Sequence, residues 1–220
     1  MTDTANLGDI VVVGVRRKKN TDVPNYDEEV TVNPDTGEPG GGGGFSDLEI
    51  DAENARQRDC AGAGYHQALQ GISTRNSKEH FSFVLNRGGN TSYTTPAPGT
   101  GDVITGADRA AVMQQHNIQY SEIEGFAHNH PSGPYCNQPG MSLQERSQAV
   151  DINSYPSLGD WSYADGIVAQ NPSIASTFTL YVTGCDNVLR SFPYTNRDYF
   201  RQQVQRANPP RPPALQTDCN

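Results

Sequence analysis

Five consecutive glycines at positions 40–44 constrain the fold of this chain more than any other feature of its sequence. Glycine has the most backbone freedom to lose on folding, so a run of this length favours a flexible linker over regular structure. We therefore predict a flexible leader over residues 1–46 with one short strand near 9–15, a compact domain over 47–205, and a Pro-rich tail over 206–220.

The composition limits the kinds of partner that the chain can bind. The formal net charge is −9, from 16 Lys and Arg against 25 Asp and Glu, so phosphate backbones and anionic membranes repel the chain. The sequence contains no run of 18 apolar residues, which excludes a typical membrane-spanning helix. The first residues lack the charged and apolar regions of a signal peptide, so we expect no classical export.

Hydrophobic periodicity and turn residues predict an alternation of helices and strands in the compact domain. This order indicates an α/β (α+β) fold in which helices flank a mixed central β-sheet. The predicted helices cover 47–72, 107–116 and 160–169, and the predicted strands cover 79–85, 91–95, 123–128, 176–183 and 188–192.

Two histidines stand at the end of the predicted strand 123–128. Side chains alternate along a strand, so His128 and His130 face the same side and can bind one metal ion together. Pro131 follows directly and ends the strand, because proline has no N–H to donate to a neighbouring strand.

A carboxylate completes this candidate metal site. Ser157 is predicted to cap the helix that follows it, which puts Asp160 three residues later in the first turn, and by itself this pattern is only a capping box. With the histidines, it places a carboxylate and a hydroxyl beside the metal, and two imidazoles with one carboxylate are typical of a catalytic zinc site. Ser142 and Glu145 offer an alternative pair of the same spacing.

The pattern His128-x-His130-Pro followed by Ser157-x-x-Asp160 resembles the motif of the JAMM (MPN+) metalloproteases, and the resemblance covers roughly residues 60–195. In detail the chain is most similar to the JAMM-like domains at the C-termini of bacterial Rhs and other polymorphic-toxin proteins. The resemblance implies a cytidine-deaminase-like fold and a Zn²⁺ ion bound by the two histidines and the aspartate. It also implies that the serine helps to stabilise the oxyanion.

The same resemblance implies a general base from an earlier element of the fold. Glu79 opens the predicted strand 79–85 and is our choice for this role. Glu122 and Glu124 are alternatives, and Glu124 shares the strand parity of the histidines. The spacing between the His pair and Asp160 exceeds the family's usual spacing, so residues 134–155 are interpreted as an insertion that acts as a lid or a substrate-selecting loop.

The resemblance implies a zinc-dependent peptidase or isopeptidase that cleaves a ubiquitin-like conjugate, a polyprotein or a peptidoglycan peptide. Its expected setting is a bacterial effector or toxin with an immunity protein as partner, secreted by a non-classical route and cytoplasmic before delivery. The alternative is a non-catalytic binding module of the same fold in a secretion or toxin system. A nuclease is disfavoured by the acidic charge, and a Cys/His peptidase built on Cys60 lacks a defined base.

Four cysteines permit two disulfides in three connectivities, or four unrelated thiols. Cys219 lies in the Pro-rich tail, and a bond from it to Cys185 would fix that tail to the domain. Disulfides would favour an oxidising destination.

Overall fold

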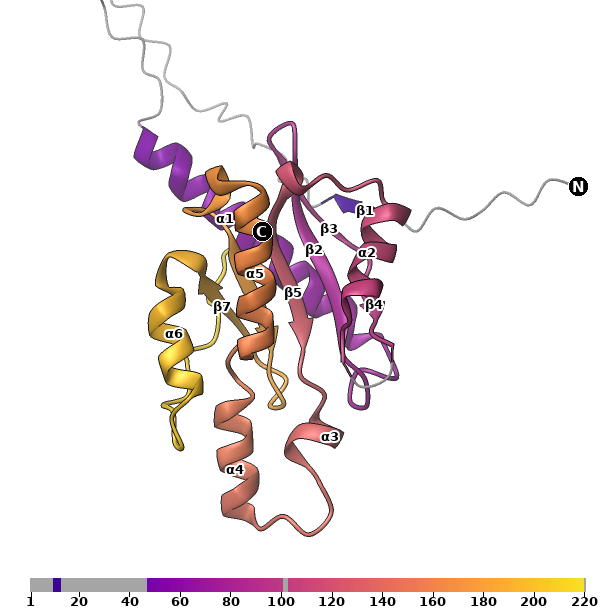
Figure 1. Ribbon diagram of the computed structural model, residues 1–220, viewed down its shortest axis with the longest axis vertical. Coiled ribbons are helices and arrows are strands. Elements are labelled where there is room, and N and C mark those ends of the chain that lie inside the picture. The colour runs from indigo at the N-terminus through magenta and orange to yellow at the C-terminus, as the bar shows by residue number, and fades with distance from the viewer. Residues whose placement is uncertain (1–9, 13–46, 101–102, 220) are drawn as a thin grey trace, which may run out of the picture.

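The computed structural model describes residues 10–12, 47–100 and 103–219, which form a β-sheet with helices on both faces (Figure 1). This architecture confirms the predicted α/β class with a mixed sheet flanked by helices. The strands are β1 (Ile10–Val12), β2 (His80–Arg87), β3 (Asn90–Thr94), β4 (Ala97–Pro98), β5 (Ile123–Asn129), β6 (Thr179–Thr183) and β7 (Leu189–Pro193). The helices are α1 (Asp47–Gln70), α2 (Gly106–Gln115), α3 (Ser132–Cys136), α4 (Leu143–Ile152), α5 (Leu158–Gln170) and α6 (Arg197–Val204), with short 3₁₀ helices at Tyr120–Glu122, Pro172–Ile174 and Tyr194–Asn196.

The strand order is β1-β3-β2-β5-β6-β7, with β4 paired to β2. The pair β5–β6 is parallel and the other pairs are antiparallel. A parallel pair needs a long crossover connection, and here the crossover contains α3, α4 and α5. Strand β5 therefore lies in the middle of the sheet, where its C-terminal end is enclosed by neighbours on both sides.

Helix α1 covers one face of the sheet and packs unusually close to it. A Cβ atom at Gly62 would lie 2.6 Å from the ring of Tyr181, and one at Gly64 would lie 2.6 Å from the ring of Tyr93. The two glycines thus leave the space that these rings fill, and larger side chains there would push the helix away from the sheet.

Helices α2, α5 and α6 lie over the other face, around an aromatic core. Trp161 is fully buried at the start of α5, and its indole stacks on Phe200 of α6 with the ring centroids 6.1 Å apart. Because aromatic rings bury large areas, this contact fixes the beginning of α5 against α6.

The predicted elements of the domain are found close to their expected positions. The predicted strand near 9–15 contains β1, and the remaining residues of that prediction lie outside the described part of the chain. The Gly40–Gly44 run and most of the leader 1–46 lie outside it as well. Helices α3, α4 and α6 were not expected. Helix α4 lies within the segment 134–155 that is interpreted as an insertion, and the C-terminal part of α3 lies there as well. Both helices extend beyond the end of β5 (Figure 1).

All four cysteines form disulfides, but the suggested pairing of Cys219 with Cys185 is wrong. Cys219 pairs with Cys60 of α1, because the tail runs back along the domain. The Leu215 amide of the tail donates to the carbonyl of Leu189 in β7 at a distance of 2.8 Å. Cys185, in the turn between β6 and β7, pairs with Cys136 of α3. None of the helices in the described part of the chain is long and apolar enough to cross a membrane.

Candidate metal centre

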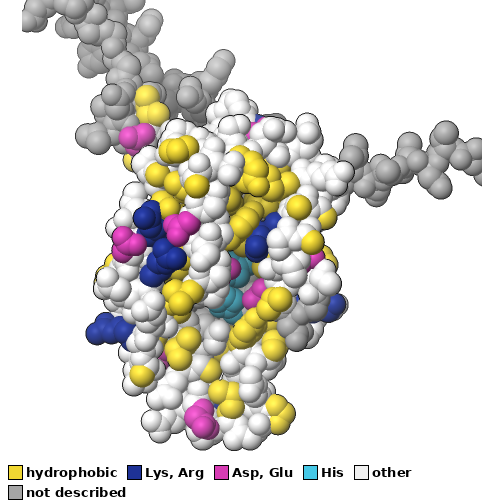
Figure 2. Space-filling model, in the orientation of Figure 1, with side chains coloured by type: hydrophobic (Ala, Val, Ile, Leu, Met, Phe, Trp, Pro, Cys, Tyr) yellow, Lys and Arg dark blue, Asp and Glu magenta, His cyan; other side chains and the backbone are white. Residues whose placement is uncertain are grey.

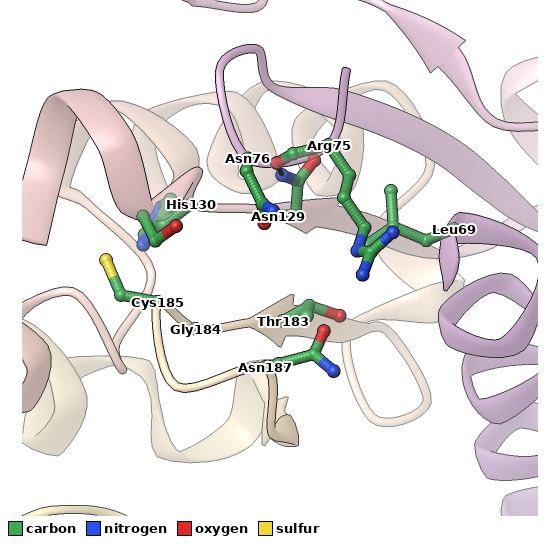
Figure 3. A pocket seen from close by; sticks show the side chains of 10 residues that line it. Leu69, Arg75, Asn76, Asn129, His130, Thr183, Gly184, Cys185 and Asn187 are labelled. Carbon is green, nitrogen blue, oxygen red and sulfur yellow. Dashed lines mark hydrogen bonds between the residues drawn. The ribbon is translucent and has the colours of Figure 1, made fainter. Parts of the chain in front are cut away.

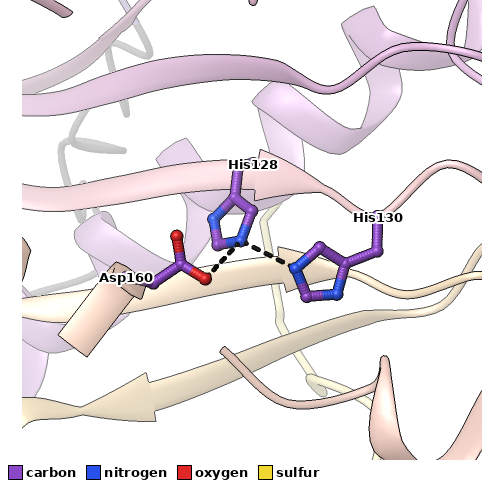
Figure 4. A group of neighbouring side chains, drawn as sticks. All are labelled: His128, His130 and Asp160. Atoms are coloured by element: carbon purple, nitrogen blue, oxygen red, sulfur yellow. Dashed lines mark hydrogen bonds and ion pairs between the residues drawn. The ribbon is translucent and has the colours of Figure 1, made fainter. Parts of the chain in front are cut away.

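The two histidines lie at the C-terminal end of β5, as the sequence predicts. His128 is the cross-strand partner of Phe81 in β2 and Val182 in β6, and its side chain is fully buried. The amide of His130 donates to the carbonyl of Thr183 at 2.9 Å, which extends the parallel ladder one residue past β5. The two Nε2 atoms face each other at 3.2 Å (Figure 4).

A backbone carbonyl sets the tautomer of His130. Its Nδ1 lies 2.8 Å from the carbonyl oxygen of Asn153, which only accepts, so the ring proton is on Nδ1 and the lone pair is on Nε2. Metal-binding histidines commonly donate their second nitrogen to such a group. The Nδ1 atom of His128 is buried and has no hydrogen-bond partner among the described residues.

Asp160 reaches the histidines from the first turn of α5. Its Oδ2 atom lies 3.2 Å from Nε2 of His128 (Figure 4). Ser157 caps the helix, and its amide and hydroxyl each donate to the same Oδ2 at 2.7 Å. The capping box predicted from the sequence is therefore present, and it aims the carboxylate of Asp160 at His128.

The spacing of these three side chains fits a metal ion. Zinc–nitrogen and zinc–oxygen bonds of about 2.0–2.1 Å in a tetrahedral site place neighbouring ligand atoms about 3.3–3.4 Å apart. Two separations in this group are 3.2 Å, and all of its ligand atoms lie within 4.8 Å of one another. The group offers the two imidazoles and one carboxylate that are common at catalytic zinc sites.

The protonation of the group supports the same interpretation. Burial, together with a positive charge on His128, lowers the pKa of His130 to about 4, so His130 stays neutral. Burial also disfavours the charged form of His128, but the adjacent Asp160 more than offsets this and raises its pKa above the ordinary value. For Asp160 burial opposes ionisation, yet His128 holds its pKa well below the usual range. A cation is thus favoured between the three side chains, whether it is a proton or a metal ion.

Glu79 is buried beside this group, immediately before β2. Its Oε2 accepts a hydrogen bond from the Ile104 amide at 3.0 Å, and its Oε1 accepts one from the hydroxyl of Tyr135 at 3.1 Å. Burial raises the pKa of Glu79, and the charge of His128 partly offsets that rise while the charge of Asp160 adds to it. The structure therefore places a carboxylate of raised pKa within the electrostatic influence of His128 and Asp160.

The competing carboxylates lie elsewhere. Glu124 bonds to Asn86 and faces Arg58 of α1, so the expectation that it shares the side of His128 is wrong. A register shift where β2 pairs with β5 changes the alternation at this point. Glu122 pairs with Arg87 at 3.0 Å.

Glu145 does not join the histidines either. It forms an exposed capping box with Ser142 at the start of α4 and lies outside the group of three metal-binding side chains.

The surroundings of the centre combine a hydrophobic floor with an open side. Phe126 packs against both Phe81 and the ring of His128, and Tyr163 of α5 contacts Phe126 edge-on. Figure 2 shows histidine and acidic side chains together in a hollow of this face, bordered by hydrophobic side chains. Leu158, next to Ser157 on the exposed side, is 45% exposed.

Sequence reasoning missed three contributors to the site: the Asn153 carbonyl, the Ile104 amide and the Tyr135 hydroxyl. Two of them are backbone groups, which no residue type reveals. Tyr135 lies in the segment interpreted as an insertion, and its distance from Glu79 along the chain gives no local signal.

A polar pocket adjoins the centre on the other side of His130 (Figure 3). It lies between the segment after α1, the end of β5 and the turn between β6 and β7, and Cys185 is at its edge. Its lining includes the side chains of Arg75, Asn129 and Asn187.

Comparison of the chain with protein-family models, with curated proteins and with solved structures finds no match.

Proposed function

We propose that this protein is a zinc-dependent hydrolase of amide bonds, a peptidase or isopeptidase of the JAMM type. One observation carries the proposal, namely the convergence of His128, His130 and Asp160 on one point at ligand spacing. The buried carboxylate of Glu79 beside them supplies the proton-transfer group that such a reaction needs. The order of these residues along the chain matches the motif that the sequence resembles.

When bound there, zinc would act as a Lewis acid and lower the pKa of a water molecule to about 7. Glu79 is suited to accept a proton from the attacking water and to return it to the leaving amine, because burial has already raised its pKa toward neutrality. Each of its oxygens accepts one hydrogen bond and keeps a second lone pair for the proton.

Ser157 is proposed to assist at the carbonyl oxygen of the substrate. Its hydroxyl donates to Asp160 in the structure, so it must rotate to donate to a developing oxyanion. Until then, the hydroxyl orients the carboxylate of Asp160.

The setting that the disulfides support best is an oxidising compartment. Both disulfides join segments that are far apart in sequence, and such bonds persist mainly in secreted and surface proteins. We therefore propose a protease effector or toxin that acts after delivery, with a ubiquitin-like conjugate, a protein chain or a peptidoglycan stem peptide as substrate and an immunity protein as partner.

The test is hydrolysis by zinc-loaded protein of a mixture of casein peptides, ubiquitin–lysine isopeptide conjugates and peptidoglycan stem peptides in H₂¹⁸O. The wild type should yield products whose new carboxylates carry ¹⁸O, detected by mass spectrometry. Glu79→Gln should bind zinc equally well and yield none. Equal cleavage by Glu79→Gln would remove this residue from the reaction, and no cleavage by the wild type would favour the binding-module alternative.

A further inference from the structure

The segment that interrupts the metal-binding motif reaches back into the site through one side chain. Tyr135 of α3 donates its hydroxyl to Oε1 of Glu79 at 3.1 Å, and its ring lies 5.7 Å from the ring of His130. The other oxygen of Glu79 accepts from a backbone amide before α2. The two donors together fix the plane of the carboxylate, and only one of them is a side chain that the rest of the protein must hold in place.

A disulfide fastens this tyrosine to the sheet. Cys136 follows Tyr135 directly and is buried, and it is bonded to Cys185 in the turn between β6 and β7. The same segment is also held by a hydrogen bond from the Gly133 amide to the Asn76 carbonyl at 2.9 Å. Helix α3 has only five residues, too few to be stable without such attachments.

We propose that Tyr135 is the positioning residue for Glu79 and that the Cys136–Cys185 disulfide holds it there, so the site is complete only in the oxidised chain. This inference rests on the proposed role of Glu79 as the proton-transfer group. It implies that the protein is weakly active where it is made under reducing conditions and fully active after it reaches an oxidising compartment.

The change of state is an ordinary thiol–disulfide exchange with a dithiol. The dithiol gives up two electrons and closes to a cyclic disulfide, while the Sγ–Sγ bond breaks and each sulfur takes up one proton. Cys185 is only partly buried at the edge of the polar pocket in Figure 3, so a small dithiol can reach it. Reduction leaves α3 without its covalent attachment to the sheet.

The first test follows the side-chain carboxyl of Glu79 by ¹³C NMR in full-length, metal-free protein labelled at glutamate, with Glu79→Gln to assign the signal. His128 and Asp160 are the charged groups that act on Glu79, and they are unchanged in every variant compared. Tyr135→Phe should raise the titration midpoint of Glu79 by about one pH unit, because a hydrogen bond that favours the charged form is lost.

Loss of the disulfide should have the same effect as loss of the hydroxyl. The variant Cys136→Ser/Cys185→Ser, and wild-type protein reduced with a dithiol, should both show the raised midpoint. The matched control is Cys60→Ser/Cys219→Ser, which removes the other disulfide and should leave the midpoint unchanged. An unchanged midpoint in Tyr135→Phe overturns the positioning role, and an unchanged midpoint after loss of Cys136–Cys185 overturns the role of the disulfide.

Turnover provides a second measurement that separates this inference from the proposed function. Oxidised, zinc-loaded Tyr135→Phe should bind one zinc, keep its KM and lose about tenfold to hundredfold in kcat. Full kcat in this variant would refute the inference while the wild type still shows hydrolysis. Failure of the proposed function would appear instead as no turnover in the oxidised wild type, whereas the carboxyl titration would still report on Tyr135.

Discussion

Replacement of Asp160 by asparagine removes one ligand of the proposed zinc site and leaves the volume of the side chain almost unchanged. The amide keeps the capping position at the start of α5, but it offers no negative charge to a metal or to His128. Removal of groups that only support a ligand costs about tenfold to hundredfold in metal affinity. Loss of the ligand itself should therefore weaken zinc binding by more than about a hundredfold.

This loss translates into folding stability, since a ligand that binds only the native state stabilises it by RT ln(1 + [L]/Kd). At free zinc equal to about 100 times the wild-type Kd, the wild type gains about 2.7 kcal/mol. For a chain of this size that corresponds to a rise in Tm of about 5–10 °C. At the same free zinc, Asp160→Asn gains less than about 0.4 kcal/mol, or a rise in Tm of about 1 °C.

Differential scanning calorimetry at buffered free zinc measures these shifts. Glu145→Gln is the matched control, because it makes the same acid-to-amide change at the third position of an equivalent capping box, far from the histidines in the exposed start of α4. It should keep the full zinc-dependent rise in Tm. A full rise in Asp160→Asn, or a lost rise in Glu145→Gln, would refute the assignment of the third ligand.

Other predictions concern the supports of the site and of the fold. Ser157→Ala should cost about 1 kcal/mol of unfolding free energy in urea titrations, as the loss of a helix cap does, and about tenfold to hundredfold in zinc affinity by competition with a chelator. Zinc affinity should rise with pH through neutrality and level off above the pKa of His128, because below this raised pKa a proton competes with the metal. Calorimetric titrations with zinc in two buffers should show, from the difference between their heats, the proton that His128 releases. Cys60→Ser/Cys219→Ser should lower the unfolding free energy by about 2–4 kcal/mol in urea without a change in zinc content. Trp161→Ala should cost about 3–5 kcal/mol in the same assay, and a value near zero would contradict the anchoring of α5 by this side chain.

Much of the fold can be predicted from the sequence because its signals are local. The alternation that leads into His128 and the capping pattern of Ser157 and Asp160 each depend on a few neighbouring residues, and both are found in the structure. Their meeting in space also follows, since one lies at the end of a central strand and the other at the start of the crossover helix that precedes the parallel strand β6.

The failures have equally physical causes. A register shift between β2 and β5 moved Glu124 to the α1 face, and no periodicity within β5 alone reveals such a shift. The pairing of Cys60 with Cys219 depends on how the tail runs back over the domain, which is a tertiary property. The hydroxyl of Tyr135 reaches Glu79 across 56 positions of sequence, so only the folded chain brings them together.

The zinc content of untagged protein, determined by elemental analysis after dialysis against trace zinc, tests the central claim most directly. The wild type should hold about one zinc per chain and His128→Ala should hold none, because that variant loses the ligand at the centre of the group. A wild type that takes up no zinc, or a His128→Ala variant that retains it, would contradict a catalytic zinc site at the end of β5.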